Sequence, residues 1–425
     1  MSIYDKASIV QIPSGYKAGT TDNLYSVLPA NGNGDFNATR GSTATRVNKD
    51  GFIESVAINV PRLDYPLIDG VVQDCPALLL EPSRTNQAQR TEEFDNSYWL
   101  KSNSTITANQ IISPDGSQTA DKYTHGGSSA ANYVRGIVGS VTSGNDYTFS
   151  VFVKKGTGTF IQMLYGSGAF GSLHQNFDIE NGLIGSSSGD ATAFIDEYPN
   201  GWYRVGITDT CTTTQSSATA FVSLVQSNTA SRLSSFTSSD NFYVWGAQVE
   251  QGSYPTSYIS WDGSGTTTRS ADLCIDSGTS AEFNASEGVL FIECSMLTNS
   301  GQNNYFSIGD TTGTRDGVEL HFRTESNRIR GIIYSSDSVT VNFDTTSFDK
   351  TNNNKIAFRY KDNDFAIWVN GSQANTRTSG AAPLKLSKLQ FSDANNGNIW
   401  YGKCKQAIVF NEALTDAELT TLTTQ

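Results

Sequence analysis

Runs in which apolar and polar residues alternate constrain the fold of this chain most strongly. In YTFSVFVK (Tyr147–Lys154) every odd position is Tyr, Phe or Val, and every even position except Phe152 is polar. Two further aromatic-rich runs occupy residues 201–207 and 241–250. Period-two alternation is typical of half-buried β-strands. Because these runs are separated by Gly- and Ser-rich turns and not by helical patterns, they predict an antiparallel β-sandwich.

A second set of strand-like runs follows in the last third of the chain. GVLFIECSM (Gly288–Met296) is apolar on both faces, and residues 355–371 read as a hairpin around a KDND turn. The chain then ends on a capping box, Thr415-Asp-Ala-Glu418, which predicts a short helix from Thr415 pinned by Leu419 and Leu422. The predicted fold class is therefore all-β: tandem antiparallel β-sandwiches of the jelly-roll type with a short C-terminal helix.

The first 85 residues lack a sustained period and contain Gly- and Asn-rich turns. Pro61, Pro66, Pro76 and Pro82 each remove a donor from any β-ladder. We interpret this stretch as an extended N-terminal segment that packs on other chains. The expected organisation is a segment at 1–85, a first sandwich at 86–275 and a second sandwich at 276–425.

Charge and cysteine content exclude several classes of function. The net charge of −13 and a pI near 4.7 argue against nucleic-acid binding, which depends on Lys and Arg. The sequence contains no run of eighteen apolar residues, so membrane insertion is not expected, and its first residues do not resemble a signal peptide. The five widely spaced cysteines match neither a disulfide framework nor a zinc site. We expect a protein that folds in the cytoplasm of a host, with its cysteines present as reduced thiols.

Several phrases of the sequence resemble bacteriophage virion proteins. ATRVNKDGFIE (44–54), NVPRLDYP (59–66) and CPALLLEPSRTN (75–86) resemble the opening of many tail, fibre and head-associated proteins. SPDGSQTADK (113–122), NGWYR (200–204) and WGAQVEQGSYPTSYI (245–259) resemble their carbohydrate-binding-module-like sandwich. The last 140 residues resemble a concanavalin A-like (laminin-G-type) lectin or glucanase domain, chiefly through GVLFIE and AIVFNEALTDAEL.

This resemblance implies a protein on the virion surface, attached to other virion proteins through the N-terminal segment and oligomeric, with trimers common in such families. An edge-rich sandwich also needs covered edges, which independently favours a homo-oligomer. We expect a tail-fibre or head-decoration component that attaches to host cell-surface glycans. A purely structural capsid or tail subunit is the alternative, and a polysaccharide depolymerase is a weaker one.

No catalytic residue is predicted. Glycoside hydrolysis needs two carboxylates across the scissile bond, and the nearest glucanase-like spacing, Glu93-Phe94-Asp95, lacks the third carboxylate of the pattern. His125 and His174 have no partner motif beside them. His321 lies in a strand context, where a packed histidine is commoner than a base, although His321 with Arg323 could mimic one strand of an alginate-lyase-like site. We therefore expect a protein without enzymatic activity.

Sugar binding needs aromatic faces that stack on pyranose rings, with polar side chains alongside. For each aromatic residue a core position is the competing interpretation, and it is the stronger one for Trp202, Trp245 and Trp368 within strands. The remaining candidates are Tyr98, Trp99, Tyr254, Tyr258, Trp261, Trp400 and Tyr401.

Calcium is the inorganic ligand that the sequence could accommodate, although no cofactor is required. The loop GDTTGTRDG (309–317) offers Asp310 and Asp316 as hard oxygen ligands. The same residue types are ordinary turn formers, so a turn without metal is the competing interpretation.

Overall fold

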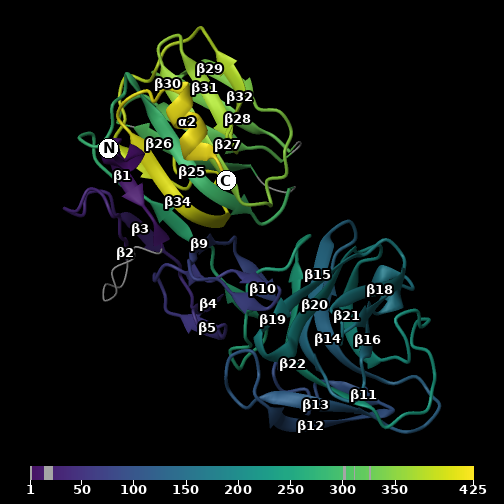
Figure 1. Ribbon diagram of the computed structural model, residues 1–425. Coiled ribbons are helices and arrows are strands. Elements are labelled where there is room, and N and C mark those ends of the chain that lie inside the picture. Colours follow the sequence, from purple (N-terminus) through teal and green to yellow (C-terminus); the bar gives the residue numbers. More distant parts are fainter. Residues whose placement is uncertain (1, 14–22, 300–302, 311, 325–326) are drawn as a thin grey trace.

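The computed structural model describes residues 2–13, 23–299, 303–310, 312–324 and 327–425. It consists mostly of antiparallel strands, arranged as two β-rich bodies with the N-terminal strands beside and between them (Figure 1). The all-β tandem sandwich predicted from alternation is confirmed.

The first sandwich consists of two six-stranded sheets. One has the order β11 (Leu100–Ser102), β14 (Tyr133–Val141), β21 (Gln215–Leu224), β16 (Phe160–Tyr165), β17 (His174–Asp178), β18 (Leu183–Ser188). The other has the order β12 (Ser104–Ile111), β13 (Ala120–His125), β22 (Asn241–Gln251), β15 (Asp146–Lys155), β20 (Trp202–Thr210), β19 (Thr192–Tyr198).

The three aromatic-rich runs of the sequence are thus neighbours in one sheet, as β15, β20 and β22. Phe149 and Val151 point into the core between the sheets. Phe152, the exception to the alternation, lies on the opposite face in a separate apolar cluster with Trp202 and Trp245. That cluster also contains Ile53 of the N-terminal segment, so β15 is covered on both faces.

The second sandwich pairs a sheet that also receives N-terminal strands with a smaller one. The larger sheet runs β32 (Ser372–Arg377), β31 (Phe365–Val369), β30 (Asn354–Lys361), β25 (Glu287–Met296), β34 (Gly402–Phe410), β9 (Ala77–Leu80), β6 (Leu63–Asp64). The smaller sheet runs β29 (Ser338–Asp344), β28 (Ile329–Ser335), β27 (Asp316–Phe322), β26 (Asn304–Asp310), β33 (Lys388–Gln390).

Strands from the first 85 residues complete the second sandwich. β1 (Ala7–Gln11) and β9 both pair with β34, at opposite ends of that strand. The interpretation of residues 1–85 as a segment packed on other chains missed this pairing, because it joins positions at opposite ends of the sequence. The remaining short pairings join β2 (Asn23–Leu24) and β24 (Leu273–Ile275) to β3 (Phe36–Thr39), β4 (Ala44–Val47) to β5 (Ile53–Val56), β7 (Leu67–Ile68) to β8 (Val71–Val72), and β10 (Arg84–Asn86) to β23 (Thr267–Arg269).

The predicted C-terminal helix is confirmed as α2 (Asp416–Thr423). The Thr415 hydroxyl accepts a hydrogen bond from the backbone N–H of Glu418, and the Glu418 carboxylate accepts one from the backbone N–H of Thr415. Leu419 and Leu422 are buried in an apolar cluster on the larger sheet of the second sandwich. Capping and anchoring therefore act together to fix the end of the chain.

The helical pieces with bounds in the described residues also include three single turns, η1 (Ile3–Lys6), α1 (Ser167–Phe170) and η3 (Pro199–Gly201). Among the residues described, no helix has the length and apolar character needed to cross a membrane. All five cysteines are unpaired thiols, and all except Cys75 are buried.

Candidate functional site at the junction of the sandwiches

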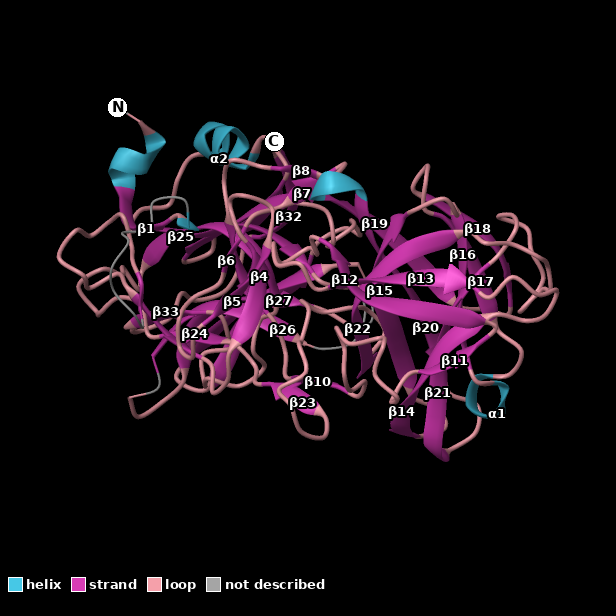
Figure 2. Cartoon of the chain, turned by 90° about the horizontal axis from the view of Figure 1, so that it is seen from below, coloured by secondary structure: helices cyan, strands magenta, loops and turns pink. Residues whose placement is uncertain are grey.

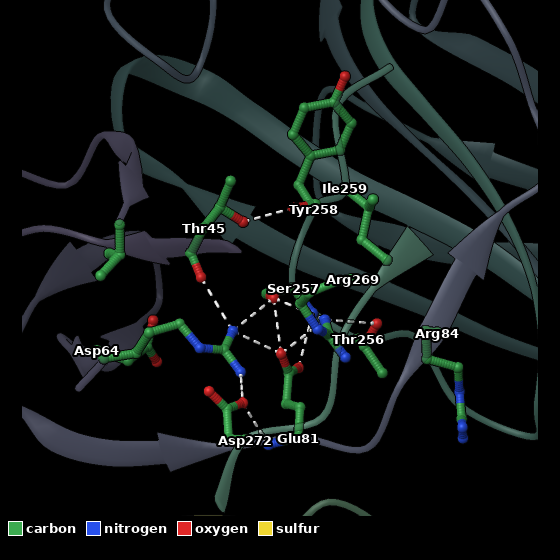
Figure 3. A network of polar contacts seen from close by, with 12 residues as sticks. Thr45, Asp64, Glu81, Arg84, Thr256, Ser257, Tyr258, Ile259, Arg269 and Asp272 are labelled. Atoms are coloured by element: carbon green, nitrogen blue, oxygen red, sulfur yellow. Dashed lines mark hydrogen bonds and ion pairs between the residues drawn. The ribbon is translucent and has the colours of Figure 1, made fainter. Parts of the chain in front are cut away.

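A network of buried charges joins the N-terminal segment to the connection between the two sandwiches (Figure 3). Arg62 pairs with Glu81 at 2.6 Å and also with Asp272, and Arg269 pairs with Glu81 at 2.8 Å. Arg40 pairs with Asp272 at 3.0 Å. All of these side chains are almost completely buried. Buried charges persist only when paired and hydrogen-bonded, and here each carboxylate has two guanidinium partners.

Glu81 receives further support from the connection after β22. The backbone N–H of Ser257 donates to one Glu81 oxygen at 2.7 Å, and its hydroxyl donates to the other at 2.6 Å. Burial opposes the charged form, but the positive charges of Arg269 and Arg62 outweigh it and hold the pKa of Glu81 well below its usual range. The network therefore stays ionised and fixes the walls of the space beside it.

That space is a cavity of about 640 Å³. Its walls come from β4, β6 and β7 of the N-terminal segment, from β19 and β20 of the first sandwich, and from β34 of the second. Cavities of roughly 300–1,000 Å³ with convergent polar groups are the usual size for small-ligand sites. We call this space the junction cavity; its polar lining includes Arg46, Asp64, Tyr65, Asp69, Asn181, Asp196, Glu197, Tyr198, Tyr203, Arg204 and Lys403.

Two cations at the junction cavity are held in place by this chain's own groups. Arg204 donates to the carbonyl oxygen of Thr256 at 2.8 Å and to the Ser150 hydroxyl at 3.0 Å. Lys403 pairs with Asp64 at 2.8 Å, and about a third of its side chain remains exposed. These anchored cations give the cavity fixed positive charge next to its acidic side chains.

Three other polar groups at the junction cavity keep hydrogen-bonding capacity for a ligand. Within the part of the chain that the structure describes, the side chains of Asp196, Tyr198 and Tyr203 make no hydrogen bond; Asp196 and Tyr198 lie on one face of the sheet and Tyr203 lies on the other. Burial raises the pKa of the Asp196 carboxyl, although Arg204 and Lys403 act in the opposite direction. Burial also raises the pKa of Tyr198 and of Tyr203, so both phenols stay protonated and can donate at neutral pH.

The sequence offered only a partial signal for these residues. Asp196 pairs with Arg204 and Tyr198 with Trp202 across β19 and β20, so strand alternation places Asp196, Tyr198 and Arg204 on one face. The phrase NGWYR marks β20, but nothing near it in sequence points to Lys403. That residue reaches the cavity from the second sandwich, through tertiary structure alone.

Three of the aromatic residues predicted to stack on sugars are in the core, so the prediction is wrong for them. Trp99 is 1% exposed and donates to the Arg90 carbonyl oxygen, and Trp400 is 0% exposed among core rings. Tyr258 lies at the junction cavity, but its ring is 3% exposed and its hydroxyl bonds to Thr91 and Glu92. No face of these rings is open to a ligand.

The other four predicted aromatic residues are half-buried, and none of them lines the junction cavity. Tyr98 donates to the Ile137 carbonyl oxygen, and Tyr401 packs against the core of the second sandwich. Cations stack on the other two rings. The guanidinium carbon of Arg84 lies 5.3 Å from the centroid of the Tyr254 ring, and that of Arg90 lies 4.2 Å from the centroid of the Trp261 ring. These rings serve local packing and do not form one surface.

The two predicted calcium ligands are bonded to donors of this chain. Asp310 accepts a hydrogen bond from the backbone N–H of Thr312 at 2.7 Å and lies 3.4 Å from the Lys385 ammonium. Asp316 accepts from the backbone N–H of Leu384 at 2.8 Å. Across the described ranges, no three His, Cys, Asp or Glu side chains gather as a metal site would require. Asp310 therefore belongs to a local turn, whereas Asp316 joins segments that are distant in sequence.

Comparison with known proteins gave structural likenesses only. No protein-family model matches the chain, and no curated protein matches its sequence. The Ruminococcus gnavus IT-sialidase CBM40, solved with α2,3-sialyllactose, is 15% identical over 33% of this chain and 84% of its own, with a TM-score of 0.29. A pentraxin from Limulus polyphemus is 13% identical over 32% of this chain and 69% of its own, with a TM-score of 0.25.

A third structure, mouse laminin α1 domains LG4-5, is 7% identical over 80% of this chain and 92% of its own, with a TM-score of 0.24. All three likenesses are to β-sandwich folds of the concanavalin A-like kind. Scores this low carry no conclusion about activity or ligand.

Proposed function

We propose that this chain binds carbohydrate in the junction cavity and leaves it chemically unchanged. The observation that carries the proposal is the meeting of two uncommitted polar side chains, Asp196 and Tyr198, with the anchored cations Arg204 and Lys403 in one cavity of about 640 Å³. Sugar hydroxyls both donate and accept hydrogen bonds. A carboxylate acceptor and a phenol donor on one face of a fixed strand complement them.

We further propose that the chain acts on the surface of a phage virion and attaches the particle to host glycans. This part rests on the resemblance of residues 44–86 and 113–259 to virion proteins. Individually weak sites would gain from repetition on a homo-oligomer, because linked sites raise the effective concentration. The acidic surface is compatible with a role that involves no nucleic acid.

A purely structural virion subunit is the second candidate. The observation that favours it is the β7–β8 hairpin, whose Ile68 and Val71 are 59% and 62% exposed. Apolar side chains at a hairpin tip suit contact with a neighbouring subunit. In that case the junction cavity would have no ligand.

The test uses the purified full chain on a glycan array and on extracted envelope polysaccharide, and measures retention and new reducing ends. We expect retention without new reducing ends, and loss of retention in the double variant Asp196→Asn/Tyr198→Phe. Asp190→Asn, in the exposed turn before β19, is the matched control. Absence of retention on every glycan would contradict binding and favour the structural subunit, whereas new reducing ends would contradict the non-enzymatic role.

A further inference from the structure

A second hollow lies on the outer face of the first sandwich, away from the junction cavity. It is a groove of about 300 Å³ between β14, β21 and the single turn α1, which lie side by side in Figure 2. Its lining includes Arg135, Ser167, Gln215, Thr219, Phe221 and Arg232. We call it the arginine groove.

Strand alternation determines which side chains form the floor of the arginine groove. Ala220 and Val222 of β21 point into the core of the sandwich. Thr219 and Phe221 therefore point outward, into the groove. Arg135 of β14 is the cross-strand partner of Phe221, and its guanidinium carbon lies 5.6 Å from the centroid of the Phe221 ring. The Phe221 ring thus stacks on one side of the Arg135 guanidinium and leaves the N–H donors of Arg135 available.

Arg232 reaches the groove from the loop before β22. Its guanidinium donates to the carbonyl oxygens of Leu173 at 3.3 Å and Tyr165 at 3.1 Å. These two contacts hold the side chain in place but leave its positive charge without a counterion. Burial lowers the pKa of Arg232, and no acidic neighbour opposes that effect.

Arg135 and Arg232 lack the anionic partners that most arginines in the described part of the chain have. Acidic residues outnumber Lys and Arg by 42 to 29, and Arg62, Arg315 and Arg359 each form ion pairs. In the ranges that the structure describes, neither Arg135 nor Arg232 pairs with a carboxylate. Two uncompensated guanidinium groups in one groove of an acidic protein form a local site for an anion.

We propose that the arginine groove binds the carboxylate or sulfate group of an acidic sugar. Guanidinium groups are suited to planar, bidentate recognition of such groups. Apolar surface lies next to them: Leu100 and Ile137 flank Arg135 on the same face and are 45% and 55% exposed. This surface fits the C–H face of a sugar ring and favours an acidic sugar over a free inorganic anion. The site is independent of the junction cavity.

The test is made on the full chain carrying Asp196→Asn and Tyr198→Phe, so that the junction cavity cannot contribute. The probes are oligosaccharides that carry a uronate, a sialic acid or a sulfate, each beside its neutral counterpart. We expect at least one acidic probe to bind tenfold or more tightly than its neutral counterpart. Arg135→Gln should weaken that binding by about tenfold or more, as expected for a charge-assisted hydrogen bond, and Arg135→Lys should weaken it less.

Arg377→Gln, on the exposed edge strand β32 of the other sandwich, is the control and should leave affinity unchanged. Thermal unfolding of each variant verifies that the fold is intact. Equal binding of every acidic probe and its neutral counterpart would overturn the proposal, and so would an unchanged affinity in Arg135→Gln. Displacement of the glycan by an equal concentration of inorganic sulfate would reduce the groove to a general anion site and would also overturn it.

Discussion

Arg62 donates a hydrogen bond to Glu81 across 2.6 Å at a point where neither side chain is more than 3% exposed. Arg62 directly precedes β6, and Glu81 directly follows β9, so the pair joins the ends of two neighbouring strands of the N-terminal segment. Arg62 also donates to the Thr45 carbonyl oxygen and the Ser257 hydroxyl. One buried cation therefore links the segment to the connection that leaves the first sandwich.

Removal of one partner from this pair should destabilise the protein strongly. Glu81→Gln leaves Arg62 and Arg269 buried without their shared carboxylate, a situation that costs about 3–5 kcal/mol. We expect the free energy of unfolding in urea to fall by that amount. Glu412→Gln, which breaks an exposed pair with Lys6, is the control and should change it by less than about 1 kcal/mol. A small effect of Glu81→Gln would mean that water enters the network.

Asp196→Asn should separate binding from stability. Burial raises the pKa of this carboxyl, so the folded state is most stable with the group protonated, and this stability is lost as pH rises through the raised pKa. The neutral amide removes that penalty, so we expect no loss of thermal stability at pH 7. Glycan retention should nevertheless fall, because the charged acceptor is gone. A parallel loss of stability and retention would show that Asp196 supports the fold instead.

Replacement of Trp400 by alanine should destabilise the protein much more than replacement of Trp261. Trp400 is 0% exposed among Phe322 and Phe391, and large-to-small core substitutions of this kind cost about 3–5 kcal/mol. Trp261 is half-buried and stacked on Arg90, an arrangement worth about 1 kcal/mol. Urea denaturation of both variants measures this contrast. Comparable losses would place Trp261 in a structural role as large as that of Trp400.

The sequence predicts the local elements of this fold well, because their determinants are local. Alternation at Tyr147–Lys154 marks β15, and the Thr415–Glu418 capping box marks the start of α2. The burial of the aromatic residues cannot be predicted from the local sequence in this way. Trp400 and Trp261 have similar polar surroundings in sequence, and only tertiary packing decides that Trp400 is enclosed.

The candidate site lies beyond local prediction for the same reason. Its charged residue from the second sandwich is Lys403 on β34, a strand that is completed by β1 and β9 from the other end of the chain. Period-two alternation identifies strands but not their distant partners. A cavity between three parts of the chain therefore leaves only the weak signal of Asp196, Tyr198 and Arg204 on one face of β19 and β20.

His321 provides a pH test in the second sandwich. Its ring stacks nearly parallel to the Tyr305 ring, with 4.1 Å between the two ring centroids. Its Nε2 lies 2.9 Å from the side-chain amide oxygen of Asn303. Burial lowers the pKa of His321 to about 4, and the charges of Arg330 and Arg323 act in the same direction. We expect an NMR titration of the ring to show its midpoint near that value.

The sign of the stability effect follows from this lowered pKa. Between the unfolded value of about 6.5 and the folded value, the unfolded chain binds the proton more readily, so stability falls as pH drops through that interval. A shift of this size corresponds to about 3 kcal/mol, lost by pH 4. His321→Gln cannot take up the proton, so its stability should fall less between pH 6.5 and 4 than that of the parent protein. An equal acid-induced loss in both proteins would assign the effect to other groups.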